Sequence, residues 1–233
     1  MGERSVSVII PALNEEASIA VVLAAVPLAA VDEIIVVDGG SSDRTVEIAQ
    51  AGGVRVICEP RRGYGRACAA GVAAAASDVI VFLDADGADD PMQIPELLAP
   101  ILAGRADMVL GSRLAGEMAS DAMRRHSMPP HQRFGNWLSA WFIRRLYGLP
   151  ITDLAPFRAV DREKLLALEM SEMTYGWPTE MIVKAARRGW RVVELPARYR
   201  PRLGGRSKIS GTLKGTLLAT YYILWTIFRY ALE

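Results

Sequence analysis

The chain has 233 residues, of which 51% are apolar, and its formal net charge at pH 7 is +1. This length and apolar content suffice for one large domain with a sizeable core. The nearly neutral charge gives no reason to expect a nucleic acid or another acidic partner, so none is predicted. Cys58 and Cys68 form neither a CxxC pair nor a zinc pattern. The first apolar run is too short for a signal peptide, which predicts a cytoplasmic protein with reduced thiols.

The first half of the chain alternates strand-like and helix-like patterns. Apolar, β-branched runs predict strands at residues 6–12, 31–40, 54–59, 78–86 and 106–113. Helical patterns fill residues 15–26, 41–53, 64–77 and 91–104, with Ser41 or Ser42 as a candidate N-cap, Gly52 as a stop signal and Pro91 in a first turn. Strands that alternate with helices predict an α/β fold with a mostly parallel sheet flanked by helices.

The second half is less regular. Residues 115–132 lack periodicity, and a connection of that length is usually functional. Amphipathic helices are predicted at residues 133–148 and 177–190, a strand at 191–199, and a basic, glycine-rich loop at 200–211. These patterns predict one main domain over residues 1–211, followed by a separate C-terminal amphipathic helix over residues 212–233.

The C-terminal helix contains an uncharged run, "LLATYYILWTIF", at residues 217–228. Twelve helical residues span only about 18 Å, too short to cross a hydrocarbon core of about 30 Å. Its aromatic residues suit a membrane–water interface, which predicts peripheral contact with the inner face of the membrane. A helix that docks on the core or in a homodimer interface is the alternative, since buried helices are also apolar all round.

Four carboxylates follow the fourth predicted strand, in "VIVFLDADGADD". Asp84 and Asp86 are two residues apart, so they point to the same side of an extended backbone. At a separation of about 6 Å their charges repel by about 3 kcal/mol. The nearest downstream base is Arg105, so a divalent cation such as Mg²⁺ or Mn²⁺ is the preferred counter-charge. Solvation of both carboxylates is the alternative.

Asp89 and Asp90, the other two acids of this cluster, directly precede Pro91. Aspartate is a favoured N-cap residue, so both are predicted to cap the helix that begins there.

Two further segments lie at the same edge of the predicted sheet. Asp38 precedes a Gly-Gly-Ser-Ser turn, where an acid can accept hydrogen bonds from a ribose or a base. The alternative is a simple helix-capping turn. The "RRGYGR" segment contains Arg61, Arg62 and Arg66, whose guanidinium groups suit phosphate oxygens; a solvated basic turn is its alternative.

Taken in order, these segments resemble a family 2 glycosyltransferase of the dolichol-phosphate-mannose-synthase-like kind. The matching stretches are "VIIPALNEE", "IIVVDGGSSDRT", "GYGRACAAGVAAAASDVIVFLDADG", "MVLGSR", "ITDLAPFRAV", "YGWPTEMIVKAARRGWRVVELPARYRPR" and "GGRSKISG". They span nearly the whole chain. The resemblance implies a GT-A-type fold that binds a nucleotide-diphospho-sugar over residues 1–211.

The resemblance also implies a role for individual residues. Asp84 and Asp86, with Ala85 between them, hold the metal and the donor diphosphate. Where the family often has Gln and His after this motif, the chain has Ala88 and Asp89, and Asp89 is a candidate replacement. The remaining nucleotide-sugar-binding residues implied by the resemblance are Pro11, Asn14, Glu15, Asp38 and Arg113. Gly40 of the glycine-rich turn and Arg66 of the basic segment are further candidates for the same site. The residues implied for a loop that closes over phosphate are Arg202, Ser207 and Lys208.

The expected reaction is transfer of a hexose from a UDP- or GDP-sugar to a polyprenyl phosphate or another membrane-linked acceptor, with inversion as the resemblance implies. A hydroxyl acceptor needs a base, for which Glu180 and Asp153 are the candidates. A phosphate acceptor needs no base, but it needs nearby cations, for which the candidates are Arg133, Arg158, Arg202 and Arg206. The alternatives are transfer to a small soluble acceptor such as a phosphorylated metabolite, and a non-catalytic module that binds nucleotide sugars.

Overall fold

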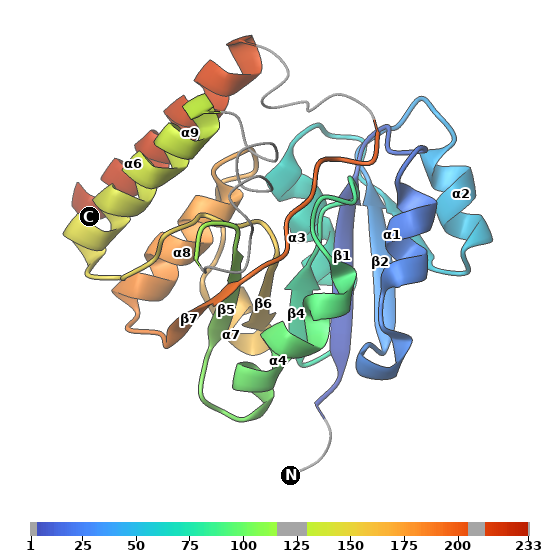
Figure 1. Ribbon diagram of the computed structural model, residues 1–233, viewed down its shortest axis with the longest axis horizontal. Helices are drawn as coiled ribbons and strands as arrows, with labels where there is room; N and C mark the ends of the chain where they lie inside the picture. The colour runs from blue at the N-terminus through green and yellow to red at the C-terminus, as the bar shows by residue number, and fades with distance from the viewer. Residues whose placement is uncertain (1–3, 116–129, 205–212, 233) are drawn as a thin grey trace.

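The computed structural model describes residues 4–115, 130–204 and 213–232. In these residues a seven-stranded sheet has the order β3-β2-β1-β4-β6-β5-β7 (Figure 1). Only β6 is antiparallel to its neighbours β4 and β5; the other strand pairs are parallel. The strands are β1 (Val6–Ala12), β2 (Glu33–Asp38), β3 (Arg55–Cys58), β4 (Val79–Phe82), β5 (Met108–Ser112), β6 (Arg158–Asp161) and β7 (Val192–Pro196). The mostly parallel α/β sheet predicted from the sequence is confirmed.

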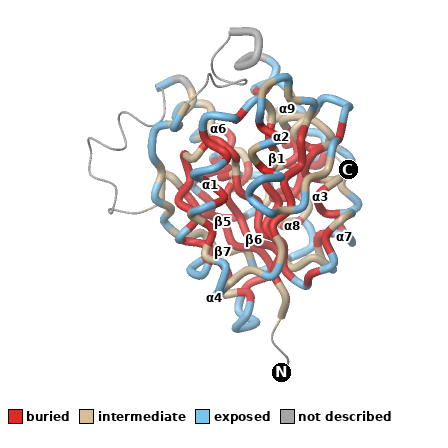
Figure 2. Tube along the Cα trace, turned by 90° about the vertical axis from the view of Figure 1, so that its right-hand side faces the viewer, coloured by how far each residue is buried: buried red, intermediate tan, exposed pale blue. Residues whose placement is uncertain are grey.

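Helices cover both faces of this sheet, because successive strand residues point to opposite sides. On β1, Ile9 packs into one apolar cluster, and Val8 and Ile10 pack into the other. The first cluster is covered by α3 (Tyr64–Ala74), α7 (Arg162–Ala167) and α8 (Trp177–Arg187). The second is covered by α1 (Ile19–Ala25), α2 (Thr45–Ala51) and α4 (Ile94–Leu102). Figure 2 shows the buried residues concentrated along the strands between these layers.

Two further helices form an outer layer beside α8. They are α6 (Pro130–Tyr147) and α9 (Leu213–Leu232), which lie side by side (Figure 1). Two short 3₁₀ turns, η1 (Leu28–Ala30) and η2 (Pro91–Gln93), complete the described structure.

One face of α9 docks on the rest of the protein. Ala219, Thr226, Ile227 and Tyr230 are buried, and the Tyr147 hydroxyl of α6 donates a hydrogen bond to the Ile227 carbonyl. The opposite face is open to solvent, with Leu218, Tyr221, Trp225 and Phe228 exposed. The helix is therefore both core-docked and available for contact, and none of the described helices is long and apolar enough to cross a membrane.

Sheet topology decides where a ligand can bind. β2 lies on one side of β1 and β4 lies on the other, so the chain connections diverge from this point. In open α/β sheets such a switch point leaves a crevice beyond the carboxyl ends of the strands. The acidic cluster after β4 and the turn after β2 are therefore brought to one edge.

Candidate active site

A hollow of about 580 Å³ opens at this edge of the sheet. Its walls come from β1 and the turn that follows it, the loop after β4, the start of α3, segment 172–176, Arg202 and α9. The lining residues are Pro11, Ala12, Leu13, Glu15, Gly39, Arg62, Gly63, Tyr64, Ala67, Asp84, Ala85, Asp86, Thr174, Tyr175, Arg202, Leu218 and Tyr222. Segments spread over most of the chain thus converge on one volume large enough for a nucleotide sugar.

Seven of the residues proposed from the sequence line this hollow together: Pro11, Glu15, Arg62, Asp84, Ala85, Asp86 and Arg202. The other described candidates lie outside its lining. Lys208, with Arg206 and Ser207, falls outside the described residues.

Asp84 lies in the strongly acidic part of the hollow, beside Asp86. Its carboxylate accepts a hydrogen bond from the Tyr64 hydroxyl at 3.1 Å. Burial and the charge of Asp86 raise the pKa of Asp84 to about 7, although Tyr64, Arg113 and Arg202 oppose that rise. A carboxyl group held so far from its ordinary pKa lacks sufficient positive charge around it.

Asp86 is paired with a distant arginine. One of its oxygens accepts from the Ala88 amide at 2.8 Å, and the other accepts from Arg202 Nη1 at 2.7 Å. Arg202 Nη2 also donates to Glu15 Oε1 at 2.7 Å. The sequence analysis preferred a divalent cation as the counter-charge because the nearest downstream base is Arg105. For Asp86 the fold instead supplies a basic partner from much farther along the chain, Arg202.

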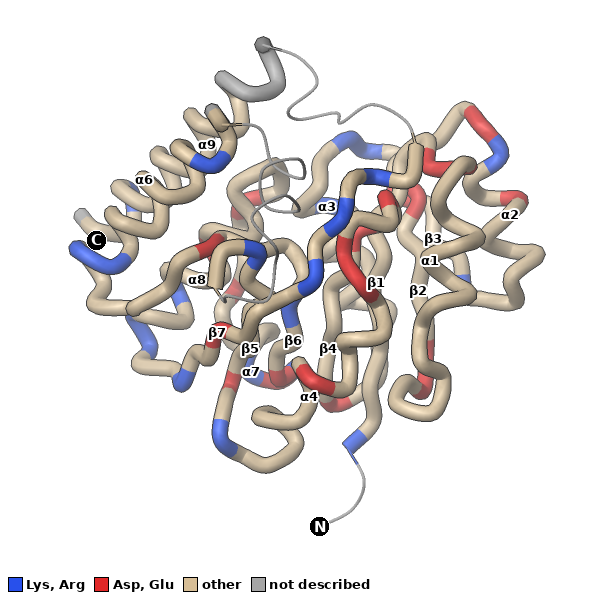
Figure 3. Tube along the Cα trace, in the orientation of Figure 1, with Lys and Arg blue, Asp and Glu red and all other residues tan. Residues whose placement is uncertain are grey.

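The segment that carries Arg202 is fixed to the acidic loop by its backbone. The Arg200 amide donates to the Ala88 carbonyl at 2.8 Å, and the Leu203 amide donates to the Asp86 carbonyl at 3.1 Å. Gly87 has φ +72°, and a Cβ there would come within 2.5 Å of the Leu203 side chain, so glycine permits this close approach. Figure 3 shows the basic segment running beside the acids that follow β4.

Asp89 and Asp90 differ in what they do. The Asp90 carboxylate accepts from the Met92 amide at 3.3 Å, as the capping prediction requires, and it pairs with Arg198 at 3.1 Å. Asp89 is only 3% exposed, and neither of its carboxyl oxygens has a hydrogen-bond partner in the described structure. Burial and the charge of Asp84 raise the pKa of Asp89 well above its ordinary value. Capping is thus confirmed for Asp90 and wrong for Asp89.

This donor set fits a hard divalent cation. A buried carboxyl without a partner is costly, and Asp89 lies close enough to Asp84 and Asp86 for their charges to raise its pKa. Among the described residues, no three His, Cys, Asp or Glu side chains are already arranged around one metal position. Mg²⁺ commonly takes only one or two carboxylates, with substrate phosphates completing its coordination.

The turn after β2 is organised by its own side chains. The Asp38 carboxylate accepts from the Gly40 amide at 3.0 Å and from the Ser41 amide, and the Asn14 side chain accepts from the Ser42 amide at 2.8 Å. Ser41 and Ser42 are therefore not N-caps, and α2 begins beyond them, at Thr45. These hydrogen bonds fix the conformation of the turn, but the lining of the hollow does not include Asp38, Gly40 or Asn14. Gly39 of the same turn does line it.

Arg113 and Asp153 form a buried pair. Arg113 Nε and Nη2 donate to the two Asp153 oxygens at 2.8 and 2.7 Å, and the guanidinium lies over the Tyr199 ring. Burial alone would raise the pKa of Asp153, but Arg113 lowers it below the ordinary value. Each partner satisfies the other, and neither lines the hollow.

Glu180 also lies away from the hollow. It is fully buried in α8 and accepts hydrogen bonds from the Tyr230 hydroxyl at 2.6 Å, from the Ser171 amide and from Lys184. Burial would raise the pKa of Glu180, but these donors lower it. Glu180 thereby fastens α9 and segment 168–172 to α8.

The start of α3 contributes residues that the sequence analysis did not single out. Tyr64 and Ala67 line the hollow, whereas the predicted Arg66 does not. Gly65 packs closely against the backbone of the distant segment 172–173, so that a Cβ at this position would lie 2.7 Å from the Met173 backbone. The wall residues Thr174, Tyr175, Leu218 and Tyr222 were likewise missed, because isolated hydroxyl and apolar residues have no motif of their own.

The family comparison decides the class of protein. The model of the glycosyl transferase family 2 matches residues 7–163, which contain the strands and loops that build most of the site. The chain belongs to this family. The glycosyltransferase is 42% identical over 221 residues to an uncharacterised glycosyltransferase of Mycobacterium tuberculosis, covering 94% of this chain and 96% of that protein. It is 32% identical over 226 residues to the undecaprenyl-phosphate mannosyltransferase of Micrococcus luteus, covering 89% of this chain and 88% of that protein.

A solved structure confirms the GT-A-type fold of this glycosyltransferase. Glucosyl-3-phosphoglycerate synthase of Mycobacterium tuberculosis, in complex with Mn²⁺, uridine diphosphate and phosphoglyceric acid, superposes with a TM-score of 0.76. The two sequences are 25% identical, and the match covers 98% of this chain and 78% of the synthase. In that relative, the fold accommodates a metal, a nucleotide and phosphoglyceric acid together.

Proposed function

We propose that this glycosyltransferase moves a hexose from a UDP- or GDP-sugar to a polyprenyl phosphate. The M. luteus relative, named for transfer to undecaprenyl phosphate, supports this acceptor class. The arrangement of α9 in this chain is the observation that carries the proposal.

Helix α9 joins the hollow to an exposed apolar surface. Leu218 and Tyr222, four residues apart and hence on one side of the helix, line the hollow. Tyr221 and Trp225, also four apart, are 59% and 53% exposed. Aromatic side chains of this kind favour the boundary between lipid and water. A helix that contributes to both surfaces suits an acceptor whose phosphate enters the hollow while its chain stays in lipid.

Asp84 and Asp86 would hold the Mg²⁺ or Mn²⁺ of the donor complex in this proposal. When bound, the cation supplies positive charge where the leaving diphosphate develops negative charge. Glu15 and Pro11 form the wall toward the nucleoside. Arg202 is close enough to Asp86 to exchange that carboxylate for a donor phosphate, for which its planar guanidinium is well suited.

A phosphate acceptor also agrees with how the candidate bases are used. Asp153 forms an ion pair with Arg113. Glu180 forms an ion pair with Lys184 and accepts a hydrogen bond from Tyr230. Both are fully buried and outside the hollow. Since an ionised phosphate is already a nucleophile, transfer to it requires no proton acceptor from the protein.

A soluble phosphorylated acceptor is the second candidate. It is favoured by the likeness to glucosyl-3-phosphoglycerate synthase, whose structure contains phosphoglyceric acid. The two acceptors share a phosphate and differ in whether a lipid chain is needed.

Transfer assays separate the two acceptors. UDP- and GDP-hexoses are incubated with Mn²⁺ and either a polyprenyl phosphate in vesicles or 3-phosphoglycerate in solution. We expect product only with the lipid phosphate, and loss of product when the metal is chelated. Efficient transfer to phosphoglycerate alone would establish the second candidate, and donor binding without transfer to any acceptor would favour a non-catalytic module.

The proposed membrane contact is tested on the exposed side of α9. Because the other side of α9 packs on α6 and α8, point substitutions are preferable to deletion of residues 212–233. Vesicle flotation should fall several-fold in a Tyr221→Ser, Trp225→Ser double variant. Leu28→Ser, at an exposed apolar residue of η1, is the control and should float like the wild type; equal flotation of all three proteins would refute the contact.

A further inference from the structure

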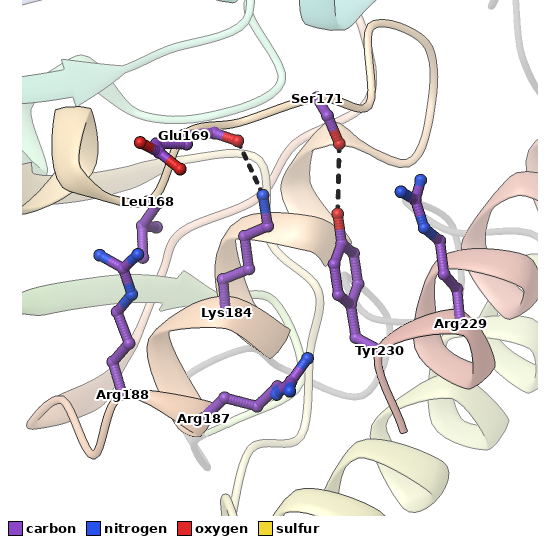
Figure 4. A pocket seen from close by; sticks show the side chains of 8 residues that line it. All are labelled: Leu168, Glu169, Ser171, Lys184, Arg187, Arg188, Arg229 and Tyr230. Carbon is purple, nitrogen blue, oxygen red and sulfur yellow. Dashed lines mark hydrogen bonds between the residues drawn. The ribbon is translucent and has the colours of Figure 1, made fainter. Parts of the chain in front are cut away.

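A second hollow, of about 470 Å³, lies between α8, α9 and segment 168–171. Its lining shares no residue with the candidate active site. Figure 4 shows its side chains, and four of the eight are basic. The lining residues are Leu168, Glu169, Ser171, Lys184, Arg187, Arg188, Arg229 and Tyr230. We call this hollow the α8–α9 basic pocket.

The basic side chains come from two helices. Lys184, Arg187 and Arg188 are spaced i, i+3 and i+4 at the end of α8, so they share one side of that helix. Arg229 comes from the last turns of α9. Basic residues near a helix C-terminus complement the dipole of that helix. That effect explains each helix separately, but it does not explain why both helices direct their bases to the same hollow.

The bottom of the pocket is a fixed hydrogen-bond network. Lys184 donates to the Glu169 carbonyl and pairs with Glu180, each at 2.8 Å. The Tyr230 hydroxyl donates to Glu180 at 2.6 Å and lies 3.2 Å from Ser171 Oγ. Glu180 therefore offsets the charge of Lys184 at the bottom of the pocket. The network fixes the positions of α8, α9 and segment 168–171 relative to one another.

Basic side chains outnumber acidic ones in the lining of the pocket. Lys184, Arg187, Arg188 and Arg229 line it together with a single carboxylate, that of Glu169, and Glu180 pairs with Lys184 from below. The guanidinium-bearing residues Arg187, Arg188 and Arg229 are exposed, so a ligand can reach them from solvent.

Glu169 adds a conformational observation. Its φ is +52°, a left-handed conformation that is unfavourable for a residue with a Cβ. It directly follows the C-cap residue of α7, where glycine is the usual choice. This conformation accompanies the bond from Lys184 to the Glu169 carbonyl and so helps to fix Lys184 at the bottom of the pocket.

We propose that the α8–α9 basic pocket binds a phosphate group of a ligand other than the sugar donor. Guanidinium groups from two helices can grip phosphate oxygens from different directions, each through paired N–H donors. The volume exceeds that of a phosphate ion and admits the rest of a small headgroup or metabolite. The phosphate belongs either to an anionic lipid headgroup or to a soluble phosphorylated molecule.

The pocket is physically coupled to the candidate active site. Tyr222 of α9 lines the active-site hollow and Arg229 lines the basic pocket, and seven residues of helix separate them by only about 10 Å. Segment 168–175 likewise borders both hollows. A phosphate in the basic pocket would therefore anchor the same helix that forms one wall of the active site.

Binding is tested on the full-length chain with two probes. In the first arm, inorganic phosphate is titrated calorimetrically in the presence of a chelator, so that metal-dependent binding at the donor site does not contribute. In the second, flotation is compared on vesicles of phosphatidylglycerol and phosphatidylcholine. The test variant is Arg187→Gln, Arg188→Gln. The control is Arg144→Gln, Arg145→Gln, an exposed pair in the last turn of α6 that makes the same charge change outside the pocket.

We expect the test variant to weaken binding of at least one probe by about tenfold or more, and the control to change it by less than about twofold. Loss in the phosphate arm alone assigns a soluble ligand, and loss only on phosphatidylglycerol vesicles assigns a lipid headgroup. Equal effects in both variants, or no binding of either probe by the wild type, would overturn the site. If the double variant does not fold, Arg188→Gln is used with the same criteria against Arg144→Gln.

Discussion

The aspartates at the two ends of the central sheet have pKa values that are shifted in opposite directions. At the carboxyl ends of β1 and β4, the pKa values of Asp84 and Asp89 are raised by burial and by neighbouring carboxylates. At the other end, where β4 and β5 begin, the pKa values of Asp78 and Asp107 are lowered by hydrogen bonds. The same residue type thus occupies two electrostatic environments within one sheet.

Each acid at the far end has its own donor. Asp107 accepts from Lys164 and Arg191, each at 2.7 Å, and from the Arg191 amide at 2.8 Å. Asp78 accepts from the amide and hydroxyl of Ser5. These contacts connect strand ends and loops, and they leave no positive charge for a ligand to supply.

The difference separates structural from functional carboxylates. Arg202 is the one direct basic partner seen among Asp84, Asp86 and Asp89 in the described residues. A protein maintains such an uncompensated cluster at a cost in stability, which is typical of ligand sites. The acids of the far end contribute to stability instead.

The largest expected effect is on Asp86. Asp86→Asn should weaken Mn²⁺-dependent binding of uridine diphosphate by at least about a hundredfold, since a metal ligand contributes several kcal/mol. Calorimetry with and without Mn²⁺ measures the change. Asp90→Asn is the matched control, because asparagine also caps helices, and it should bind normally. Unchanged affinity in Asp86→Asn would mean that the carboxylates at the two ends do not differ as proposed.

Asp107→Asn should leave nucleotide binding intact and lower the free energy of unfolding by about 2 kcal/mol at pH 7. The pKa of Asp107 is lower in the folded protein than in the unfolded chain. Its contribution is therefore fully present at neutral pH, begins to decline as the pH falls below about 4, and is lost only as the pH approaches the much lower folded-state pKa. Denaturant unfolding at a series of pH values from about 7 down to about 2 measures this, and a difference between variant and wild type that does not shrink over that range would contradict the assignment.

Arg202→Gln tests the ion pair between Arg202 and Asp86 at the acidic end of the sheet. Without the arginine, Asp86 loses its guanidinium partner, and Mn²⁺ alone should bind about tenfold more tightly, equivalent to one charged hydrogen bond. Transfer activity should fall, because the proposed phosphate contact is also lost. Arg198→Gln, which removes a base from Asp90, is the control. Metal affinity that is equal or weaker in Arg202→Gln would show that the arginine and the metal do not compete.

The smallest effect is expected for Arg4→Gln at the far end. The Arg4–Asp161 pair is 2.6 Å long but partly exposed, so its loss should lower the free energy of unfolding by no more than about 1 kcal/mol. Thermal and denaturant unfolding measure the change. Nucleotide affinity should stay at the wild-type value; a change there would reveal coupling between the two ends.

Much of this fold could be predicted because its signals are local. The apolar runs and their intervening helices predicted β1 to β5 and the α/β class, and the pattern after residue 177 predicted α8 and β7. β6 was not predicted as a strand, because only two of its residues, Ala159 and Val160, are apolar and charged residues flank them. Its antiparallel position between β4 and β5 depends on pairing with strands distant in the sequence.

For the site, the sequence by itself determined which chemical groups are present and that those following β1, β2 and β4 meet at one edge, since parallel strands bring their carboxyl ends together. The tertiary structure decided which charges meet. It brought Arg202 to Asp86 across 116 positions, and it paired Arg113 with Asp153 instead of leaving both open. The physical reason is that electrostatic interactions depend on distance in space and on burial, and spacing along the chain specifies neither for segments that meet only after folding.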